Sequence, residues 1–188
     1  ALKALDKFKA GALKISAQNN YMLDYHIREA RLKLAIGTVD GFETSLSNAL
    51  TSCQAVYGET STRYATTLLD GGEIYIEYGN FKVAREYIEK AEALLQKTEQ
   101  LNDELVGRIA LLKAEALIGQ GFANQALELL ATVEKYFTTR AVDKETIVEN
   151  EQIKTHRLDD SEIFARHNDY ARYKTLVGMA YAKKGRIS

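Results

Sequence analysis

Residues 72–91 read GEIYIEYGNFKVAREYIEKA, and the pattern in this stretch occurs three times along the chain. Gly37, Gly79 and Gly121 stand 42 residues apart, and four neighbouring columns repeat in the same register. Those columns are small or apolar: Ala30, Gly72 and Ala114; Phe42, Ala84 and Ala126; Leu46, Ile88 and Leu130; Ala49, Ala91 and Val133. Columns in phase over three copies predict a tandem repeat. Stacked repeats usually provide a binding surface rather than a reaction vessel.

Composition narrows the class of protein further. The 188 residues carry 25 Lys+Arg against 26 Asp+Glu, and a net charge near zero disfavours nucleic-acid binding. No apolar run reaches the roughly 18 residues that span a bilayer, and the sequence shows no signal peptide, so no membrane insertion is expected. The single cysteine, Cys53, rules out an intrachain disulfide. A cytoplasmic setting is expected, although a cysteine-poor periplasmic protein would look the same.

Apolar residues follow helical spacing throughout, and no convincing period-2 strand is visible. Proline is absent, which fits a nearly all-helical chain because proline breaks helix interiors. Each repeat is expected to be two antiparallel helices joined at a glycine, which enters the left-handed conformation without a Cβ clash. The expected organisation is a half-repeat at 1–16, repeats at 21–58, 60–99 and 102–137, and the first helix of a fourth repeat at 162–188. Helix N-caps are expected at Thr60 or Ser61 and at Asn102 or Asp103.

The spacing breaks once, before the last copy. Gly178, Tyr181 and Gly185 carry the signature of Gly72, Tyr75 and Gly79, but Gly185 follows Gly121 by 64 residues instead of 42. The extra material is the polar stretch 138–161, which is expected to form an exposed loop or an additional surface helix. Such an insertion costs little, because loop-closure entropy grows only logarithmically with length.

These residues resemble the tetratricopeptide repeat family. Six positions of the family pattern are matched by Gly72, Tyr75, Gly79, Ala84, Ile88 and Ala91. The third copy matches with mild substitutions, and the first departs at Lys33 and Phe42. The period exceeds the family's usual length of about 34 residues, and is similar to the long-helix variety in kinesin light chains and many bacterial repeat proteins. The resemblance implies an all-α, right-handed α-solenoid, a superhelix of antiparallel helix hairpins. Both ends look cut, so a longer array or larger protein is expected.

In this family the first helix of each pair lines a concave groove. The resemblance therefore assigns these groove residues: Asp24, Ile27, Arg31, Leu34, Thr66, Leu69, Glu73, Ile76, Glu77, Arg108, Leu111, Glu115, Ile118, Arg172, Thr175, Met179 and Lys183. We expect an apolar floor, with the acidic cluster Glu73, Glu77 and Glu115 between Arg31 on one side and Arg172 with Lys183 on the other. The hypothesis is a groove for a peptide or partner helix with apolar anchors and at least one basic residue. The alternative is that these charges form solvated helix faces.

Catalytic and metal-binding interpretations find little support. His26 is expected to be packed inside its helix pair, and His156 and His167 lack the close spacing of zinc ligands. Cys53 falls on a buried stripe, and Gly71-Gly72 is better explained by close helix packing than by phosphate binding. We therefore expect no enzyme, no catalytic residue, no metal and no cofactor. Four tyrosines are expected to pack between helices: Tyr75, Tyr78, Tyr87 and Tyr181. For two others, Tyr170 and Tyr173, a contact with a partner remains an open alternative.

The favoured function is a protein–protein interaction or scaffold module that binds a protein or peptide within a larger protein or assembly. Two alternatives remain open. One is a regulatory or sensor repeat domain attached to an enzyme or DNA-binding module outside this chain. The other is an array that self-associates through its exposed ends.

Overall fold

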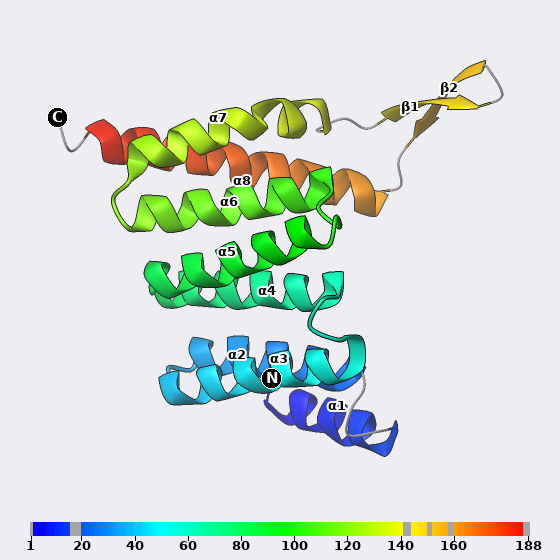
Figure 1. Cartoon of the computed structure of the whole chain (residues 1–188), viewed down its shortest axis with the longest axis vertical. Coiled ribbons are helices and arrows are strands. Elements are labelled where there is room, and N and C mark those ends of the chain that lie inside the picture. Colours follow the sequence, from blue (N-terminus) through cyan, green and yellow to red (C-terminus); the bar gives the residue numbers. More distant parts are fainter. Residues whose placement is uncertain (1, 16–19, 141–143, 150–151, 158–159, 186–188) are drawn as a thin grey trace. The chain divides into compact units, whose positions relative to one another are not determined.

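The computed structural model describes residues 2–15, 20–140, 144–149, 152–157 and 160–185. The chain divides into two compact units, Ala1–Leu101 and Asn102–Ser188, which are described separately. Apart from one short β-hairpin, the described residues form helices, so the predicted all-α class is confirmed for the bodies of both units, and the packing of neighbouring helices fits a repeat (Figure 1).

Unit 1 contains two helical hairpins preceded by one further helix. Its helices are α1 (Leu2–Ile15), α2 (Asn20–Ala35), α3 (Val39–Tyr57), α4 (Thr62–Tyr78) and α5 (Phe81–Lys97). Figure 1 shows α2 beside α3 and α4 beside α5, and these two pairs make the most extensive helix contacts of the unit. Helix α1 packs on α2, and α3 packs on α4. The two hairpins cover nearly the same residues as the first two predicted repeats, 21–58 and 60–99.

Local chemistry explains where the helices begin and end. Ser61 accepts a hydrogen bond from the Tyr64 amide at 3.1 Å, and Asn102 accepts one from the Leu105 amide at 2.9 Å, so each is an N-cap. Gly37, Gly58, Gly79 and Gly121 have φ values of 79°, 82°, 87° and 88°, in the left-handed region that favours glycine. The predicted caps and the predicted glycine ends are confirmed.

Close packing inside the second hairpin depends on two glycines that stand in the middle of α4. A Cβ on Gly71 would lie 2.8 Å from Tyr87 Cδ1, and one on Gly72 would lie 2.7 Å from Ile88 Cγ1 and 3.2 Å from the Ala84 carbonyl oxygen. These distances are shorter than ordinary carbon contacts, so α5 could not approach α4 as closely with larger residues. The interpretation of Gly71-Gly72 as a packing feature is confirmed.

Unit 2 is built on three helices and one hairpin of strands. Its elements are α6 (Asp103–Gly119), α7 (Ala123–Arg140), β1 (Lys144–Glu149), β2 (Gln152–Arg157) and α8 (Asp160–Gly185). Helix α8 packs on both α7 and α6, and the three share one core. Within that core the Phe137 and Tyr173 rings stack with centroids 5.3 Å apart. Tyr173 is 3% exposed, so it is a core residue rather than a partner contact.

The inserted stretch differs from its prediction as a loop or a surface helix. Part of it is an antiparallel β-hairpin in which Lys144 pairs with Arg157 and Glu149 pairs with Gln152 (Figure 1). The sequence of the strands is rich in β-branched residues, such as Ile147, Val148 and Ile153, which favour extended backbone. The sequence did not predict these strands, because the stretch is polar overall and its apolar and polar residues do not alternate regularly.

Candidate functional site

The first helices of the two hairpins in unit 1, α2 and α4, lie next to each other and are joined by ion pairs. Arg31 on α2 donates to Glu73 at 2.8 Å and to Glu77 at 2.5 Å, both on α4. Arg63 on α4 donates in turn to Asp24 on α2 at 2.8 Å. Burial alone would lower the pKa of Arg31, but the hydrogen bond and charge of Glu73, with the charge of Glu77, raise it. Arg31 therefore stays charged and held in place.

Unit 2 has the same kind of link between its first helices, α6 and α8. Arg172 on α8 donates to Glu115 on α6 at 2.7 Å. Asp169, one turn earlier on α8, has a pKa raised by burial in spite of the nearby charges of Arg172 and Arg140. We call these surfaces the first-helix faces: α2 with α4 in unit 1, and α6 with α8 in unit 2.

The three carboxylates of the predicted acidic cluster are each paired with an arginine of the same unit. Glu73 and Glu77 share Arg31, and Glu115 is paired with Arg172. A basic residue of a ligand would have to displace an arginine that already satisfies these oxygens. The pairs stay in contact with water, and their geometry is set within the fold before any ligand arrives.

The predicted apolar floor is largely closed. Leu69, Ile76, Leu111 and Ile118 are 0%, 8%, 3% and 1% exposed, so they belong to the core and offer little surface to a ligand. The other predicted groove residues are at least partly accessible. Half-buried are Asp24, Ile27, Arg31, Leu34, Thr66, Glu73, Arg108, Glu115 and Arg172, and exposed are Glu77, Thr175, Met179 and Lys183.

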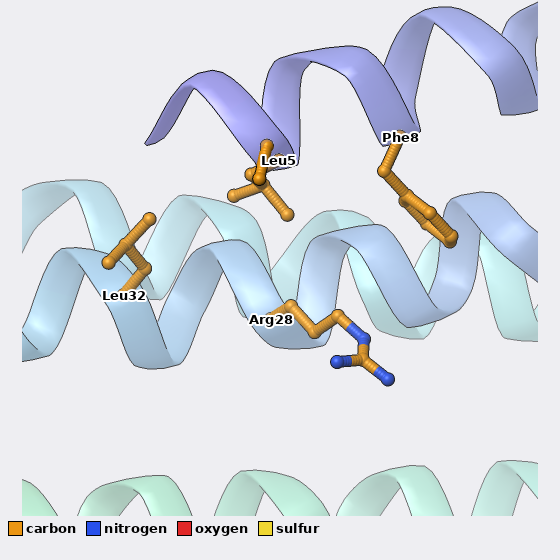
Figure 2. Close-up of a pocket in the computed structure, with 5 residues that line it drawn as sticks. Leu5, Phe8, Arg28 and Leu32 are labelled. Atoms are coloured by element: carbon orange, nitrogen blue, oxygen red, sulfur yellow. The ribbon is translucent and has the colours of Figure 1, made fainter. Parts of the chain in front are cut away.

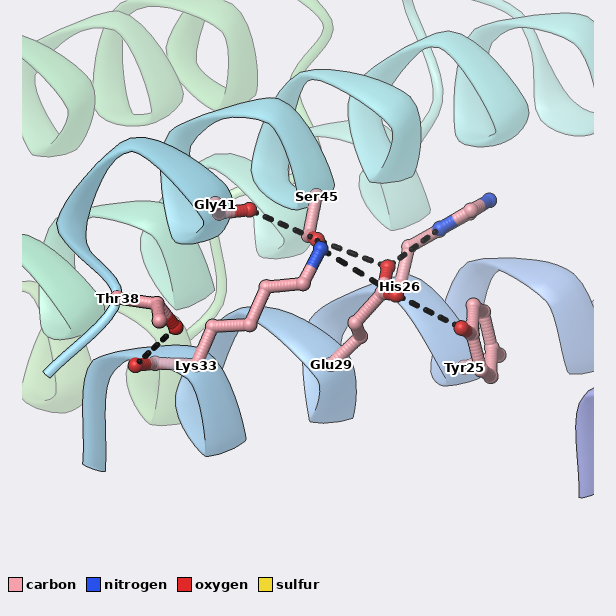
Figure 3. A network of polar contacts seen from close by, with 7 residues as sticks. All are labelled: Tyr25, His26, Glu29, Lys33, Thr38, Gly41 and Ser45. Carbon is pink, nitrogen blue, oxygen red and sulfur yellow. Dashed lines mark hydrogen bonds and ion pairs between the residues drawn. The ribbon is translucent and has the colours of Figure 1, made fainter. Parts of the chain in front are cut away.

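A second polar cluster lies between α2 and α3 and was not anticipated as a cluster (Figure 3). The Glu29 carboxylate accepts hydrogen bonds from the Tyr25 hydroxyl at 2.7 Å and the Ser45 hydroxyl at 2.8 Å. Lys33 Nζ donates to Ser45 Oγ at 2.9 Å and lies 3.3 Å from Glu29. Burial raises the pKa of Glu29, but these hydrogen bonds and the Lys33 charge outweigh it and leave the pKa below its usual value. We call Tyr25, His26, Glu29, Lys33 and Ser45 the α2–α3 polar cluster.

His26 completes this cluster without a hydrogen bond at Nδ1. That buried atom lies 3.6 Å from Glu29 Oε2, which is too far for a hydrogen bond, and it has no other partner among the described residues. Burial lowers the pKa of His26, against the raising effect of Glu29. The ring also meets Tyr25 edge to face, with centroids 5.1 Å apart. The prediction of a packed histidine is confirmed.

The remaining candidate chemical groups do not come together. His156 lies on β2 and His167 is exposed on α8, and the part of the chain that the structure describes holds no group of three or more potential metal ligands. Cys53 is fully buried, its Sγ accepts a hydrogen bond from the Thr67 hydroxyl at 3.4 Å, and burial raises the pKa of its thiol. The prediction of a buried cysteine is confirmed.

Two of the tyrosines predicted to pack between helices are more exposed than expected. Tyr181 is 61% exposed on α8, so its predicted packing role is wrong in this chain, and Tyr78 is 40% exposed although its ring lies 5.1 Å from that of Phe42. The cause for Tyr181 is visible at Gly178, where a Cβ would have no neighbouring atom within 4 Å, whereas a Cβ on the equivalent Gly72 would meet Ile88. The Gly178–Tyr181 side of α8 carries no described helix that corresponds to α5.

A pocket between α1 and α2 was also missed from the sequence. Figure 2 shows Leu5 and Phe8 extending from α1 toward α2, which carries Arg28 and Leu32. The α2 residues that lie opposite Leu5 and Phe8 were not identified from the sequence. The signal that could have found them is the spacing of Arg28 and Leu32, which puts both on one side of α2.

Comparison of the chain with protein-family models, curated proteins and solved structures gave no match. Among the described residues, no helix has the length and apolar character required to cross a membrane.

Proposed function

We propose that the chain is a protein-interaction module of the tetratricopeptide type, with the first-helix faces as its ligand-binding surface. In this proposal the hairpins form a right-handed superhelix, and the chain acts as a scaffold within a larger protein or assembly. Binding, rather than catalysis, is its role. The ligand is a peptide or a partner helix.

One observation carries the proposal: in both units, adjacent first helices are linked by an arginine held on carboxylates of the neighbouring repeat. Arg31 reaches Glu73 and Glu77 in unit 1, and Arg172 reaches Glu115 in unit 2. Polar groups fixed in this way lose little conformational freedom when a ligand arrives, and such preorganisation favours binding. Half-buried apolar side chains such as Ile27 and Leu34 lie on the same helix as Arg31 and offer contacts for an apolar anchor.

The paired carboxylates refine the expected ligand. A ligand with exposed backbone amides or hydroxyl groups can use the free lone pairs of Glu77 and Glu115 without breaking the arginine bridges. A lysine or arginine must instead compete with Arg31 or Arg172. The ligand is therefore expected to combine apolar anchors with neutral polar groups. Charged groups of the ligand are expected to determine its register on the surface more than its affinity.

The test uses peptides selected from a displayed random library against the whole chain. Thr66→Arg on α4 and Thr175→Arg on α8 place a bulky charge on the two first-helix faces. Ala93→Arg on α5 and Ala131→Arg on α7 are the controls, because both residues are exposed on second helices. Selected peptides should lose about tenfold or more in affinity on one or both face variants, which corresponds to about 1.4 kcal/mol, and bind the controls normally. Peptides that bind all four variants equally would contradict the proposal.

A further inference from the structure

The pocket between α1 and α2 has apolar walls and one cationic group. Ala4, Leu5, Phe8 and Leu32 supply the walls, Arg28 supplies the guanidinium, and the volume is about 520 Å³ (Figure 2). All five residues belong to unit 1. The pocket is lined in part by α1, so it is distinct from the first-helix face that α2 makes with α4.

The apolar wall of this pocket is incompletely covered. Phe8 is 36% exposed, and its ring lies edge to face with that of Tyr21, which is itself 51% exposed, with centroids 6.3 Å apart. On the inner side, by contrast, Ala12 packs with Met22 and Tyr25 in a small core. Burying apolar surface yields about 25 cal/mol per Å², and adjacent exposed apolar groups often mark a protein-binding site.

Arg28 is the charged residue that lines the pocket, and α1 carries more lysines than carboxylates. Arg28 forms no hydrogen bond or ion pair with any residue that the structure describes, and the same is true of Lys3, Lys7 and Lys14 on the exposed side of α1. Asp6 is the only carboxylate in the sequence of α1. The arginines of the first-helix face in unit 1, Arg31 and Arg63, are each paired with carboxylates.

We infer that this pocket is a docking site for an acidic amphipathic helix of a partner protein. Apolar side chains at i, i+3 or i+4, and i+7 of that helix would enter between Leu5, Phe8 and Leu32. Glutamates or aspartates flanking this stripe would meet Arg28 and the lysines of α1. Anchors in the pocket would carry most of the affinity, and the charges would speed association and select acidic partners.

Charge argues against the C-terminal end of α8 in a second copy of this chain as the occupant. The exposed apolar residues near the C-terminal end of α8, Met179 and Tyr181, lie near Lys174, Lys183 and Lys184 in sequence, whereas the exposed Phe164 near its N-terminal end lies beside Glu162. These lysines would face the lysines of α1, and like charges across an interface are unfavourable.

The experiment is a selection from a display library of helical peptides of about 20 residues, long enough to span a small domain. The library is selected against the whole chain and counter-selected against Arg28→Glu. The enriched peptides should be net acidic with an apolar stripe, and should bind Arg28→Glu at least tenfold more weakly. Lys82→Glu on α5 is the charge control and should bind normally, since Lys82 is also exposed but lies on a different hairpin. Phe8→Ala should weaken binding, whereas Leu13→Ala, an exposed α1 residue that does not line the pocket, should not.

Several outcomes would overturn the inference. Enriched peptides that are neutral or basic, or that bind Arg28→Glu as well as the unaltered chain, would exclude an acidic helix. Concentration-dependent dimers lost on Phe8→Ala would identify a second copy as the occupant, and binding to phosphatidylserine vesicles without peptide binding would identify lipid. Peptides sensitive only to Thr66→Arg or Thr175→Arg would leave the proposed function intact and refute this site, so the two failures are distinguishable. Circular dichroism of each variant confirms that it is folded.

Discussion

Removing the Ser45 hydroxyl should weaken the first hairpin by a measurable amount. Ser45 is completely buried, donates to Glu29 at 2.8 Å and accepts from Lys33 at 2.9 Å (Figure 3). In Ser45→Ala both charged groups lose a neutral partner inside the α2–α3 polar cluster. Glu29 keeps the Tyr25 hydroxyl and Lys33, so the carboxylate stays ionised but is less completely solvated.

The magnitude follows from two opposing terms. Hydrogen bonds to charged groups contribute about 1.5–3 kcal/mol each. Because Glu29 and Lys33 keep some contact with water, which replaces part of each lost bond, we take the two bonds together as about 2.5 kcal/mol. Alanine is a better helix former than serine, and this difference offsets about 0.5 kcal/mol of the lost stability. The net destabilisation is about 2 kcal/mol, or about a thirtyfold rise in the open population at 1.36 kcal/mol per factor of ten.

Cys53 provides a local assay for this prediction. It lies on α3, fully buried against Leu23 of α2, so a thiol reagent reaches it only when the hairpin opens. When opening is fast relative to labelling, the labelling rate follows the open population. Ser45→Ala should therefore label about thirtyfold faster than the unaltered chain, as estimated from the hydrogen-bond terms.

Ser47→Ala is the matched control, because Ser47 is exposed on the same helix. It should change the labelling rate by no more than about twofold, since exposed substitutions usually cost under about 0.5 kcal/mol. Equal rates for Ser45→Ala and Ser47→Ala would refute the idea that the polar cluster stabilises the hairpin.

Three further predictions concern the turns, the pH response and the thiol. Gly121→Ala should lower the unfolding free energy by about 1–2 kcal/mol, because the φ of 88° at this position disfavours a residue with a Cβ. Gly178→Ala should raise the unfolding free energy by up to about 1 kcal/mol, because Gly178 lies within α8 and a Cβ there meets no other atom. Urea melts followed by circular dichroism compare the two variants, and equal effects would contradict the assignment of Gly121 to a turn. Because folding lowers the pKa of His26, the unfolded chain binds a proton at this residue before the folded chain does, and the unfolding free energy should fall as the pH drops below about 6.5. His26→Gln should reduce this fall in the unfolding free energy. The lowered pKa of Glu29 should cause a second fall at more acidic pH. Cys53 should react with Ellman's reagent only slowly in the folded chain, since burial raises the pKa of its thiol, and fast, complete reaction without denaturant would contradict its placement.

The repeat and its boundaries were predictable because they depend on local chemistry. A glycine ends a helix in the left-handed region at Gly79, and a hydroxyl caps the next one at Ser61, whatever the rest of the chain does. The small column at Gly72 also follows from packing within one hairpin.

The departures of the first copy from the family pattern were visible in the sequence, but their meaning was not. Lys33 stands where a tyrosine is expected, and Phe42 where an alanine is expected. In the structure the Phe42 ring fills the gap beside Tyr75, with centroids 5.5 Å apart. The Lys33 stem passes over Gly41, where a Cβ would lie 2.9 Å from Lys33 Cδ, and carries its ammonium to Ser45. These contacts join residues of two helices, and spacing along one helix does not predict them.

The ion pairs on the first-helix faces were beyond prediction for a related reason. Arg31 and Glu73 occupy the same position in successive repeats, 42 residues apart, so periodicity places them on one face but does not choose their partners. The choice depends on side-chain reach, and the long arginine side chain closes the distance that a shorter residue would leave to water. The pairing of Glu73 with Arg31 and of Glu115 with Arg172 therefore emerged only from the structure.

The most direct test of the interaction proposal is amide chemical-shift mapping with a selected peptide that is sensitive to Thr66→Arg or Thr175→Arg. We expect the perturbed amides to lie on the first helices, on α2 and α4 or on α6 and α8, and to include the neighbours of Arg31 or Arg172. Perturbations confined to α3, α5 or α7, or spread evenly over all the helices, would contradict the proposal.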